Sequence, residues 1–315
     1  MPRRTLMLVG AAHAHTPDHV RIVAEEQWSI IRVFDRDHER RQRWCAELGA
    51  EPADAIAPDG IDGVLVCGET CHRETDITAA LNAGLPVFTE KPLASTGAAA
   101  HRLAELAKRT GVLLDTGYFL RTNAALTALR DQVRYGTIGQ VLDAHLRFAH
   151  DGAYADWLDV SGWMTDPALA CFGGFGDEVV HILDWLLWTL GPIASGQTLL
   201  GHALGEPVDD HGTALLKMHD GAQVILAAGW TDIRLRLEID IVGSNGQATL
   251  RDGYARVLTR DNGDGPVWEQ PLPTLDAGEG LRPFLSALAG GGRTGLIRPA
   301  EAAAVSAALE DLYRR

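Results

Sequence analysis

Short apolar runs alternate with segments of helical composition along the first part of the chain. Residues 5–10 form an aliphatic run closed by a glycine, residues 18–26 have helical composition, and residues 29–34 form a second apolar run. This strand–helix–strand order predicts parallel pairing, because parallel strands are joined by a crossover that is usually a helix. The alternation returns in residues 62–89. It predicts an α/β domain over residues 1–121.

The pattern changes beyond residue 139, where strand-like runs follow one another closely. Asp220-Gly221 and Asn245-Gly246 are typical hairpin turns between such runs. Hairpins join antiparallel strands, so this half predicts a large, mostly antiparallel open sheet in an α+β domain over residues 122–315. An Ala-rich helix closes the chain, with the option of packing back on the first domain. The strand-like runs are residues 140–148, 212–218, 222–228, 235–242 and 248–250, and the closing helix is residues 299–313.

Composition narrows the classes of function. The chain of 315 residues has 46% hydrophobic residues and a formal net charge of −14, which argues against the basic face that nucleic acids require. No apolar run approaches the roughly 20 residues of a membrane span. The four cysteines show no framework spacing, so reduced thiols in a cytoplasmic protein are expected. The expected partner is a small molecule, with neither nucleic acid nor membrane.

The loop after the first strand carries an imperfect dinucleotide fingerprint. The pattern G-x-G-x-x-G/A places small residues where this chain has Gly10, Ala12 and His15. Gly10 suits the tight turn, and the methyl group of Ala12 adds little bulk to the loop. His15, however, stands where close helix–strand packing favours no side chain. The loop alone is weak evidence for a cofactor site.

Asp35 strengthens that evidence. It ends the second strand, 25 residues after Gly10, where a carboxylate accepts hydrogen bonds from the adenosine ribose 2′-hydroxyl. The same carboxylate repels a 2′-phosphate, which favours NAD over NADP. Arg36, Arg40 and Arg41 oppose this preference, because a cationic cluster can hold the phosphate. The alternative is that Asp35 is only a turn residue or the cap of the following helix.

His13, His15 and His19 lie close enough in sequence to raise the question of a metal. Apart from Asp18, no Cys or carboxylate stands at ligand spacing from them. We therefore expect no metal, and expect these loop histidines to lie beside a pyrophosphate.

Glu90-Lys91-Pro92 follows the short strand of residues 87–89. In open parallel sheets, ligands bind outside the carboxyl ends of the strands, which is where this motif stands. A lysine there is a candidate proton donor and acceptor, since a desolvated pocket lowers the pKa of an ammonium group. The alternative is that both charges are solvated loop residues and that Pro92 only ends the strand.

A helix in the second half carries an unusual polar row. Asp177, His181 and Asp184 fall within one narrow stripe at about 100° per residue, and aliphatic residues fill the opposite arc. Residues 173–188 contain no Lys or Arg, so we expect the row to face a cleft rather than solvent. The alternative is a half-buried helix in which Asp177 supports the N-terminus and His181 is an interior histidine.

Together these motifs make the chain resemble the glucose–fructose oxidoreductase, inositol dehydrogenase and rhizopine-catabolism family (Gfo/Idh/MocA) over essentially its full length. Glu90-Lys91-Pro92 and Asp177-x-x-x-His181 are specific as a pair. The other matching residues are Gly10, Asp35 with Arg36-Asp37, residues 80–84, Gly117-Tyr118 with Arg121, residues 136–139, Trp163, Asp166-Pro167 and Asp184.

The resemblance implies an N-terminal Rossmann domain, a nicotinamide cofactor (NAD, with NADP as the alternative) and substrates such as sugars, cyclitols and related polyols. Lys91 would be the general acid/base on the reacting hydroxyl, His181 would hydrogen-bond that oxygen, and Asp177 would orient the substrate. A homodimer or homotetramer through the open sheet is also implied. The expected cofactor contacts are Gly10, Ala12, His13, His15, Asp35, Arg36, Cys67, Gly68, Glu69, His72, Glu90 and Lys91. The expected substrate contacts are Tyr118, Arg121, Trp163, Met164, Asp177 and His181.

Several positions depart from the family pattern. Gly68-Glu69 stands where the family has Thr-Pro, Arg73 aligns with a family histidine, and Met164 replaces an arginine. Glu69 is expected to add an anion on the nicotinamide side, while Met164 and Phe172 make the pocket less polar. A substrate that carries an amine or an apolar group is therefore one hypothesis.

Two functions remain open. The first is an NAD(P)-dependent dehydrogenase or reductase acting on a sugar, cyclitol or modified sugar, with in-place recycling of the cofactor as a narrower version. The second is a catalytically silent family member that senses a ligand or cofactor, which the imperfect loop favours. Retention of Lys91, Asp177 and His181 favours the enzyme, because a sensor needs no proton relay.

Overall fold

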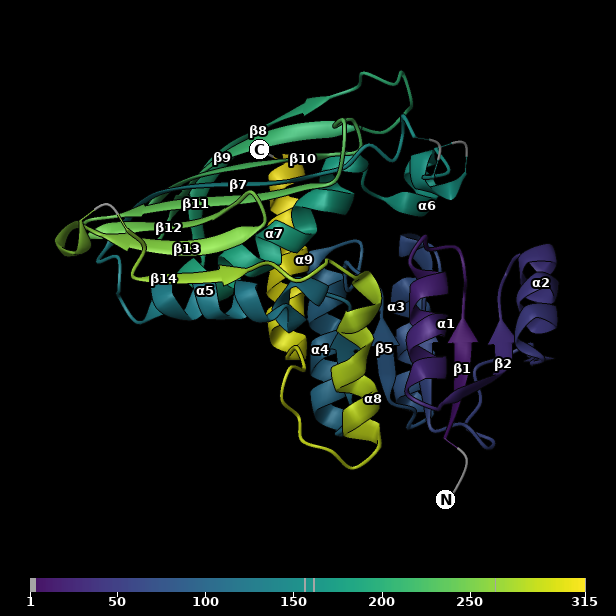
Figure 1. The fold of residues 1–315 in the computed structure, drawn as a ribbon. Helices are drawn as coiled ribbons and strands as arrows, with labels where there is room; N and C mark the ends of the chain where they lie inside the picture. Colours follow the sequence, from purple (N-terminus) through teal and green to yellow (C-terminus); the bar gives the residue numbers. More distant parts are fainter. Residues whose placement is uncertain (1–3, 156, 161, 264, 315) are drawn as a thin grey trace. The chain divides into compact units, whose positions relative to one another are not determined.

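The computed structural model describes residues 4–155, 157–160, 162–263 and 265–314. Contacts divide the chain into two units that interleave in sequence (Figure 1). The first unit takes in Met1–Phe119, Ala168–Cys171 and Asp276–Ala307, and the second takes in Leu120–Pro167, Phe172–Leu275 and Ala308–Arg315. The last part of the chain thus contributes to both units.

The first unit is built on a six-stranded parallel sheet with the order β3-β2-β1-β4-β5-β6. The α/β domain expected from the alternating pattern is confirmed. The strands are β1 (Thr5–Val9), β2 (Ser29–Phe34), β3 (Glu51–Pro52), β4 (Gly63–Val66), β5 (Val87–Thr89) and β6 (Leu114–Thr116). The helices that follow them are α1 (Thr16–Glu25), α2 (His38–Leu48), α3 (Arg73–Asn82) and α4 (Gly97–Thr110), with the 3₁₀ turn η1 (Thr70–His72) before α3.

Helix ends in this unit follow local capping chemistry. Asp37 caps α2, since its side chain accepts a hydrogen bond from the Arg40 amide at 2.8 Å, and Thr96 caps α4 in the same way. α2 and α4 are followed by Gly49 and Gly111, whose φ angles of 62° and 71° lie in the left-handed region that glycine adopts easily. Local sequence therefore sets where these helices begin and end.

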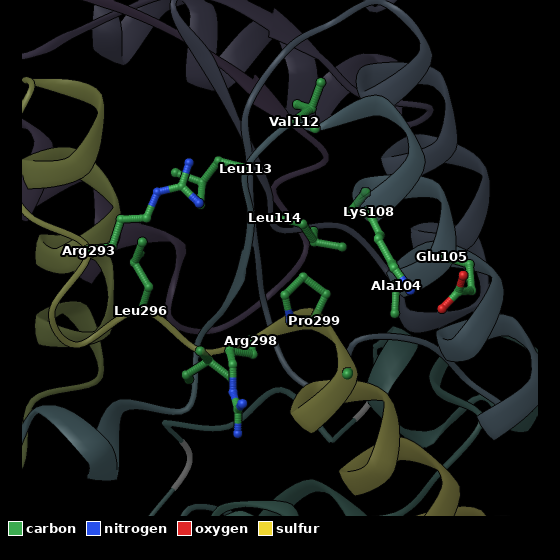
Figure 2. A pocket seen from close by; sticks show the side chains of 14 residues that line it. Ala104, Glu105, Lys108, Val112, Leu113, Leu114, Arg293, Leu296, Arg298 and Pro299 are labelled. Carbon is green, nitrogen blue, oxygen red and sulfur yellow. The ribbon is translucent and has the colours of Figure 1, made fainter.

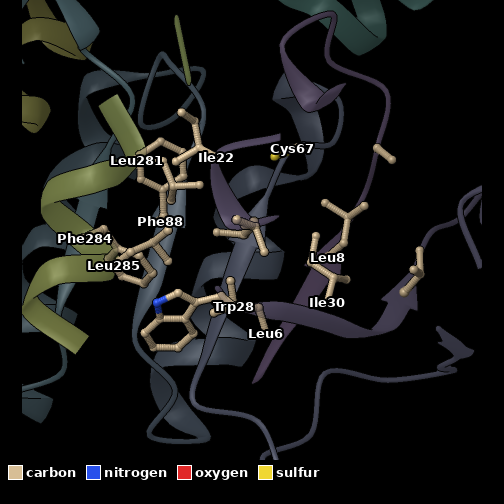
Figure 3. Packing of buried hydrophobic residues seen from close by; sticks show 14 of the residues in the cluster. Leu6, Leu8, Ile22, Trp28, Ile30, Cys67, Phe88, Leu281, Phe284 and Leu285 are labelled. Carbon is tan, nitrogen blue, oxygen red and sulfur yellow. The ribbon is translucent and has the colours of Figure 1, made fainter. Parts of the chain in front are cut away.

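A segment from far along the chain completes the core of the first unit. Leu281, Phe284 and Leu285 pack in one cluster with Phe88 of β5 and with Trp28 (Figure 3). The segment is η5 (Ala277–Leu281) followed by α8 (Arg282–Leu288). The sequence pattern did not predict α8, because seven residues give little periodicity. Its burial in this cluster shows that α8 is part of the core of the first unit.

The predicted closing helix is confirmed as α9 (Pro299–Arg314). Its first part belongs to the first unit, where Ala307 lies against the start of α4. A Cβ at Gly97 would come 2.7 Å from the Cβ of Ala307, so glycine allows the two helices to approach this closely.

The second unit contains an eight-stranded sheet with the order β14-β13-β12-β11-β7-β10-β9-β8. β7 and β10 pair in parallel and the other neighbours are antiparallel, which confirms the mostly antiparallel sheet. The strands are β7 (Val141–Ala149), β8 (Ile193–Gly201), β9 (His211–Met218), β10 (Gln223–Gly229), β11 (Arg236–Gly243), β12 (Gly246–Arg251), β13 (Tyr254–Thr259) and β14 (Trp268–Pro271). The other elements are η2 (Phe119–Thr122), α5 (Ala124–Arg134), η3 (Trp163–Thr165), α6 (Pro167–Ala170), α7 (Gly174–Leu190) and η4 (Arg260–Asn262).

Among the strands that the apolar pattern did not predict are the edge strands β8 and β14. β8 has no buried position along its length, so its sequence lacks the apolar alternation of a half-buried strand. β14 has only four residues. Pairing with β9 and β13, rather than local pattern, makes these segments strands.

α7 packs against β7, β9 and β10 (Figure 1). β9 alternates buried and exposed positions, so the sheet has one covered face and one open face. On the open face, Leu199 of β8 and Leu215 of β9 are 77% and 48% accessible. Although α7 is strongly apolar, none of the described helices has both the length and the apolar composition needed to cross a membrane.

Candidate functional site

Four predicted cofactor residues stand at the carboxyl ends of neighbouring parallel strands. Gly10 follows β1, Asp35 follows β2, Gly68 lies just beyond β4, and Glu90 follows β5. Gly10 has a φ of 66°, and a Cβ there would lie 2.5 Å from the Cα of Gly68. Position 10 therefore requires glycine for the close approach of the two loops.

The Asp35 carboxylate is buried and accepts four hydrogen bonds. Oδ2 accepts from the Ala11 amide at 2.9 Å and from Arg40 Nε at 2.7 Å. Oδ1 accepts from the Asp37 amide at 2.9 Å and from Arg40 Nη2 at 2.7 Å. Asp35 therefore ties the phosphate loop to the start of α2, and the cap of that helix is Asp37 rather than Asp35.

Arg40 also reaches Glu69, whose Oε1 accepts from Nη2 at 2.7 Å. The guanidinium thus bridges two carboxylates, those of Asp35 and Glu69. This corrects the expectation of an extra anion on the nicotinamide side. The charge of Glu69 is paired, and its side chain extends toward the end of β2, where the adenosine ribose is expected.

The other two arginines of this region are paired as well. Arg36 Nη2 lies 2.7 Å from Asp76 Oδ1, and Arg41 Nη1 lies 3.1 Å from the exposed carboxylate of Asp54. The ion pair with Asp76 turns the Arg36 side chain toward α3, on which Asp76 lies. These ion pairs weaken the case for a cationic cluster that would hold a 2′-phosphate.

The loop from residue 10 to α1 fits a dinucleotide. The His13 amide donates to the Cys67 carbonyl at 2.9 Å, which holds the loop on the end of β4. His15 is the N-cap of α1, and its side chain makes no capping hydrogen bond within the described structure. The partial positive charge of a helix N-terminus favours a phosphate. Ala12 and Gly10 add little bulk, so these residues can hold the pyrophosphate of NAD.

Glu90 is buried among three histidines. Its carboxylate lies 3.5 Å from His13 Nε2, 3.3 Å from His15 Nδ1 and 2.6 Å from His19 Nε2. Burial lowers the pKa of His13 well below its usual value, against the attraction of Glu90. Burial also raises the pKa of Glu90, but the hydrogen bonds of His15 and His19 to the carboxylate oppose it, and that pKa lies well below its usual value.

Lys91 is buried beyond β5, and Arg73 holds its main chain. Arg73 Nη1 donates to the Lys91 carbonyl and, at 2.9 Å, to the Pro92 carbonyl, while Nη2 donates to the Gly68 carbonyl at 3.4 Å. The Lys91 amide donates to Glu90 Oε2 at 3.0 Å. Arg73 is fully buried and was not predicted as a site residue. Its only signal was that it stands where the resembled family has histidine.

Two further predicted site residues of the first unit follow strands of the parallel sheet, His72 after β4 and Tyr118 after β6. His72 ends η1 and is half-buried. Tyr118, a predicted substrate contact, is buried just beyond β6.

In the second unit, Asp177 and His181 lie one turn apart on α7. Asp177 is half-buried, and its Oδ2 accepts from Trp230 Nε1 at 3.0 Å. His181 is 1% exposed, and its ring stands edge-on to Phe148 of β7 with 5.4 Å between centroids. α7 is buried around most of its circumference, and the expectation that its polar row faces a cleft stays a prediction.

Asp184 has a different role from the other members of the row. It is fully buried, and its two oxygens accept from Arg121 Nε at 2.9 Å and Nη2 at 2.7 Å. The Arg121 guanidinium also lies 5.0 Å from the ring centroid of Trp188. Arg121, a predicted substrate contact, is thus committed to an ion pair inside the second unit.

The apolar residues near Asp177 form a small cluster. Met164 packs with Trp230, Leu158 and Val208, and Trp163 lies against this group. Trp230, which sequence reasoning missed, therefore links the predicted wall residue Met164 to the carboxylate of Asp177. This agrees with the less polar surroundings expected from Met164.

Tyr313 of α9 fixes the start of α7. Its hydroxyl accepts from the Gly173 amide at 3.2 Å and the Gly176 amide at 2.9 Å, and it donates to the Asp209 carboxylate at 2.9 Å. A Cβ at Gly176 would lie 2.6 Å from that hydroxyl. The glycines before Asp177 therefore permit an anchor that no local pattern revealed.

A separate cavity of about 510 Å³ lies between the end of α4, the start of β6 and residues 293–300 (Figure 2). Lys108, Arg293 and Arg298 stand at its rim around Leu113 and Leu114. Because the strands are parallel, the start of β6 lies at the opposite edge of the sheet from Gly10 and Asp35. The cavity is therefore not the dinucleotide site.

Comparison with known proteins identifies the group to which the chain belongs. Residues 5–118 match the NAD-binding Rossmann fold of an oxidoreductase family, and residues 126–249 match the GFO/IDH/MocA C-terminal domain. The chain is a member of the Gfo/Idh/MocA oxidoreductase family. Lys91 and the phosphate loop fall in the first matched region, and Asp177 and His181 in the second.

Curated relatives of this family member extend over most of both chains. It is 28% identical over 298 residues to an inositol 2-dehydrogenase of Acidothermus cellulolyticus, covering 88% of this chain and 76% of the relative. It is 28% identical over 280 residues to a 1,5-anhydro-D-fructose reductase of Ensifer adhaerens, covering 84% and 82%. An oxidoreductase domain protein from Kribbella flavida shares the fold, with a TM-score of 0.82 at 23% identity over 100% and 97% of the chains.

Proposed function

We propose that the protein is an NAD-dependent oxidoreductase that interconverts a carbinol and a carbonyl on a cyclitol, a sugar or a modified sugar, with Lys91 as general acid/base. Membership in the oxidoreductase family and relatives named inositol 2-dehydrogenase and 1,5-anhydro-D-fructose reductase support the reaction type. The observation that carries the role of Lys91 is its burial at the carboxyl end of β5, on the edge that carries the phosphate loop and Asp35.

Lys91 suits proton transfer because its main chain is fixed. Arg73 holds its carbonyl, and Glu90 accepts from its amide. A positioned amine accepts the proton of the substrate hydroxyl as the C–H bond breaks, and returns a proton to the oxygen in the reverse direction. Bound NAD supplies the hydride acceptor.

Asp177 and His181 have supporting roles in this proposal. His181 hydrogen-bonds the reacting oxygen, and Asp177 orients the substrate through an adjacent hydroxyl. The hydrogen bond from Trp230 to Asp177 Oδ2 fixes the carboxylate, which favours a defined substrate orientation. The apolar cluster of Met164 and Trp230 next to Asp177 supports a substrate with an apolar group.

NAD is the preferred cofactor in this proposal. Asp35 stands at the end of β2, and the neighbouring arginines Arg36, Arg40 and Arg41 are each paired with a carboxylate. A 2′-phosphate would meet Asp35 and would have to compete for an arginine that is already paired.

The sheet of the second unit supports self-association. Leu199 and Leu215 are exposed on neighbouring strands, so a second copy would bury apolar surface there. We propose a homodimer or homotetramer through this face. Light scattering of the wild type and a Leu199→Glu variant tests it, and a monomeric wild type would count against it.

The deciding experiment compares Lys91→Ala with the wild type on a panel of cyclitols, sugars and amino sugars, with NAD and NADP. Turnover of the best substrate should fall by about 10²–10⁴ if Lys91 is the acid/base, with NADH affinity nearly unchanged. Lys108→Ala, an exposed lysine on α4, is the matched control and should keep wild-type turnover.

A wild type that turns over none of the panel, yet binds NADH in a fluorescence titration, would favour the alternative of a ligand- or cofactor-sensing protein. Full turnover by Lys91→Ala would remove Lys91 from the chemistry while leaving the reaction class in place. Equal kcat/KM for neutral and amino sugars would contradict the preference for a modified substrate.

A further inference from the structure

The buried carboxylate of Glu90 is approached by three histidines and one backbone amide. His19 Nε2 lies 2.6 Å from Oε1, and the Lys91 amide donates to Oε2 at 3.0 Å. These two donors occupy one acceptor position on each oxygen, out of about four that a carboxylate offers. His13 and His15 also face the same carboxylate, at 3.5 Å and 3.3 Å. All of these residues belong to the first unit.

The spacing of these atoms matches a metal site. One ligand atom each from His13, His15 and Glu90 lies within 4.8 Å of the other two. With metal–nitrogen and metal–oxygen bonds of about 2.0–2.2 Å, the ligands of a tetrahedral ion lie roughly 3.4 Å apart. His13 Nε2 lies 3.5 Å from Glu90 Oε2, and His15 Nδ1 lies 3.3 Å from Oε1. Each histidine is thus near this spacing from one oxygen of the carboxylate, and binding of one ion requires the three ligand atoms to draw together from within 4.8 Å.

We propose that the first unit binds a divalent transition-metal ion of the zinc type through His13, His15 and Glu90, with His19 orienting the Glu90 carboxylate. Imidazole and carboxylate are common ligands of such ions, and three protein ligands leave a position open for water. A histidine that hydrogen-bonds a ligating carboxylate is a typical outer partner of such a site.

The sequence alone argued against a metal site, because Asp18 is the one carboxylate close to the histidines along the chain. The fold supplies Glu90 from 75 residues beyond His15. The ion would connect the phosphate loop to the strand end that carries Lys91. The site does not depend on the proposed reaction, since metal binding can be measured without cofactor or substrate.

Metal binding requires one local rearrangement. The His15 amide donates to His13 Nδ1 at 3.2 Å, so the proton of the neutral His13 ring is on Nε2. Coordination through Nε2 moves that proton to Nδ1, and the hydrogen bond from the His15 amide must open. His15 is partly exposed, at 26%, and lies in a loop, so the segment between the two histidines can shift.

The test uses the full chain, stripped of metal by chelator and titrated with Zn²⁺ in a calorimeter and with Co²⁺ by visible absorption. We expect about one equivalent of Zn²⁺ and a Co²⁺ spectrum with the intense bands of low coordination number. His15→Asn should weaken binding by at least about tenfold, the lower end of the range for losing even an outer partner. His101→Asn, which changes an exposed histidine on α4, should bind as the wild type does.

Glu90→Gln provides a second variant of nearly equal size and should also lose at least about tenfold in affinity. Circular dichroism shows whether each variant is folded. Saturable Zn²⁺ binding of equal affinity in the wild type and both variants would overturn the proposal, as would a wild type with no binding below roughly 0.1 mM. Loss of dehydrogenase activity, by contrast, bears on the proposed function and not on this site.

Discussion

The guanidinium of Arg40 donates to both carboxylate oxygens of Asp35, from Nε to Oδ2 and from Nη2 to Oδ1, each at 2.7 Å. Amides of Ala11 and Asp37 donate to the same two oxygens. A carboxylate has about four acceptor positions, so Asp35 is fully occupied. Recognition of a ribose hydroxyl by Asp35 therefore requires Arg40 to give up at least one of these bonds.

Replacing Asp35 with serine should shift cofactor preference toward NADP. The variant loses the carboxylate that repels a 2′-phosphate, and Arg40 is released from its main partner. We expect the dissociation constant of NADH to rise and the NADPH to NADH affinity ratio to increase by about tenfold or more, which is 1.4 kcal/mol. Fluorescence titration of both dinucleotides measures it. Asp54→Ser removes an exposed carboxylate from Arg41 and is the control; an unchanged ratio in Asp35→Ser would refute the assignment.

Arg73→Lys should lower stability although positive charge is retained. A lysine ammonium cannot reproduce the fork with which Arg73 reaches the carbonyls of Gly68, Lys91 and Pro92. Leaving a buried carbonyl without its donor costs about 1–3 kcal/mol in the free energy of unfolding. Urea denaturation measures this loss. Arg102→Lys, at an exposed ion pair with Glu74, should be indistinguishable from the wild type.

Asp184→Asn should mainly lower stability. The change leaves the buried Arg121 without its counter-charge, which costs about 3–5 kcal/mol in comparable buried pairs. The double variant Arg121→Met with Asp184→Leu removes both charges and should be more stable than Asp184→Asn. Thermal and urea unfolding of the three proteins measure this. A folded Asp184→Asn of wild-type stability that lacks turnover would instead assign Asp184 to the chemistry.

Tyr313→Phe should weaken the start of α7. The phenylalanine keeps the ring but loses the hydroxyl that accepts from the amides of Gly173 and Gly176 and donates to Asp209. We expect a loss of about 1–3 kcal/mol in the free energy of unfolding. If Asp177 orients substrate as proposed, KM should rise more than kcat falls. Tyr135→Phe, on a tyrosine that is 82% exposed, is the control and should change neither quantity.

Trp230→Phe tests the Asp177 carboxylate by removing the hydrogen bond that Trp230 donates to it. The variant keeps an aromatic ring in the cluster with Met164 but cannot donate to Asp177 Oδ2. Under the proposed function, we expect the loss of one oriented hydrogen bond to raise KM by about tenfold or less. Steady-state kinetics with the best substrate measure it, and an unchanged KM would show that Asp177 does not need this partner.

The sequence by itself determined most of the element types and the two kinds of sheet. Apolar runs ending at Gly10 and before Asp35, and the hairpin turn Asn245-Gly246, report the periodicity of the local backbone. The same local signals marked the phosphate loop and the Glu90-Lys91 motif.

Only the tertiary structure decided which side chains meet. Glu90 and His19 are 71 residues apart, and Tyr313 and Gly176 are 137 residues apart. No periodicity spans such distances, because the partner of a buried polar group is set by which strand ends and helix termini the fold brings together. That is why the bridging role of Arg40, the anchoring by Arg73 and the histidine cluster appear only in the folded chain.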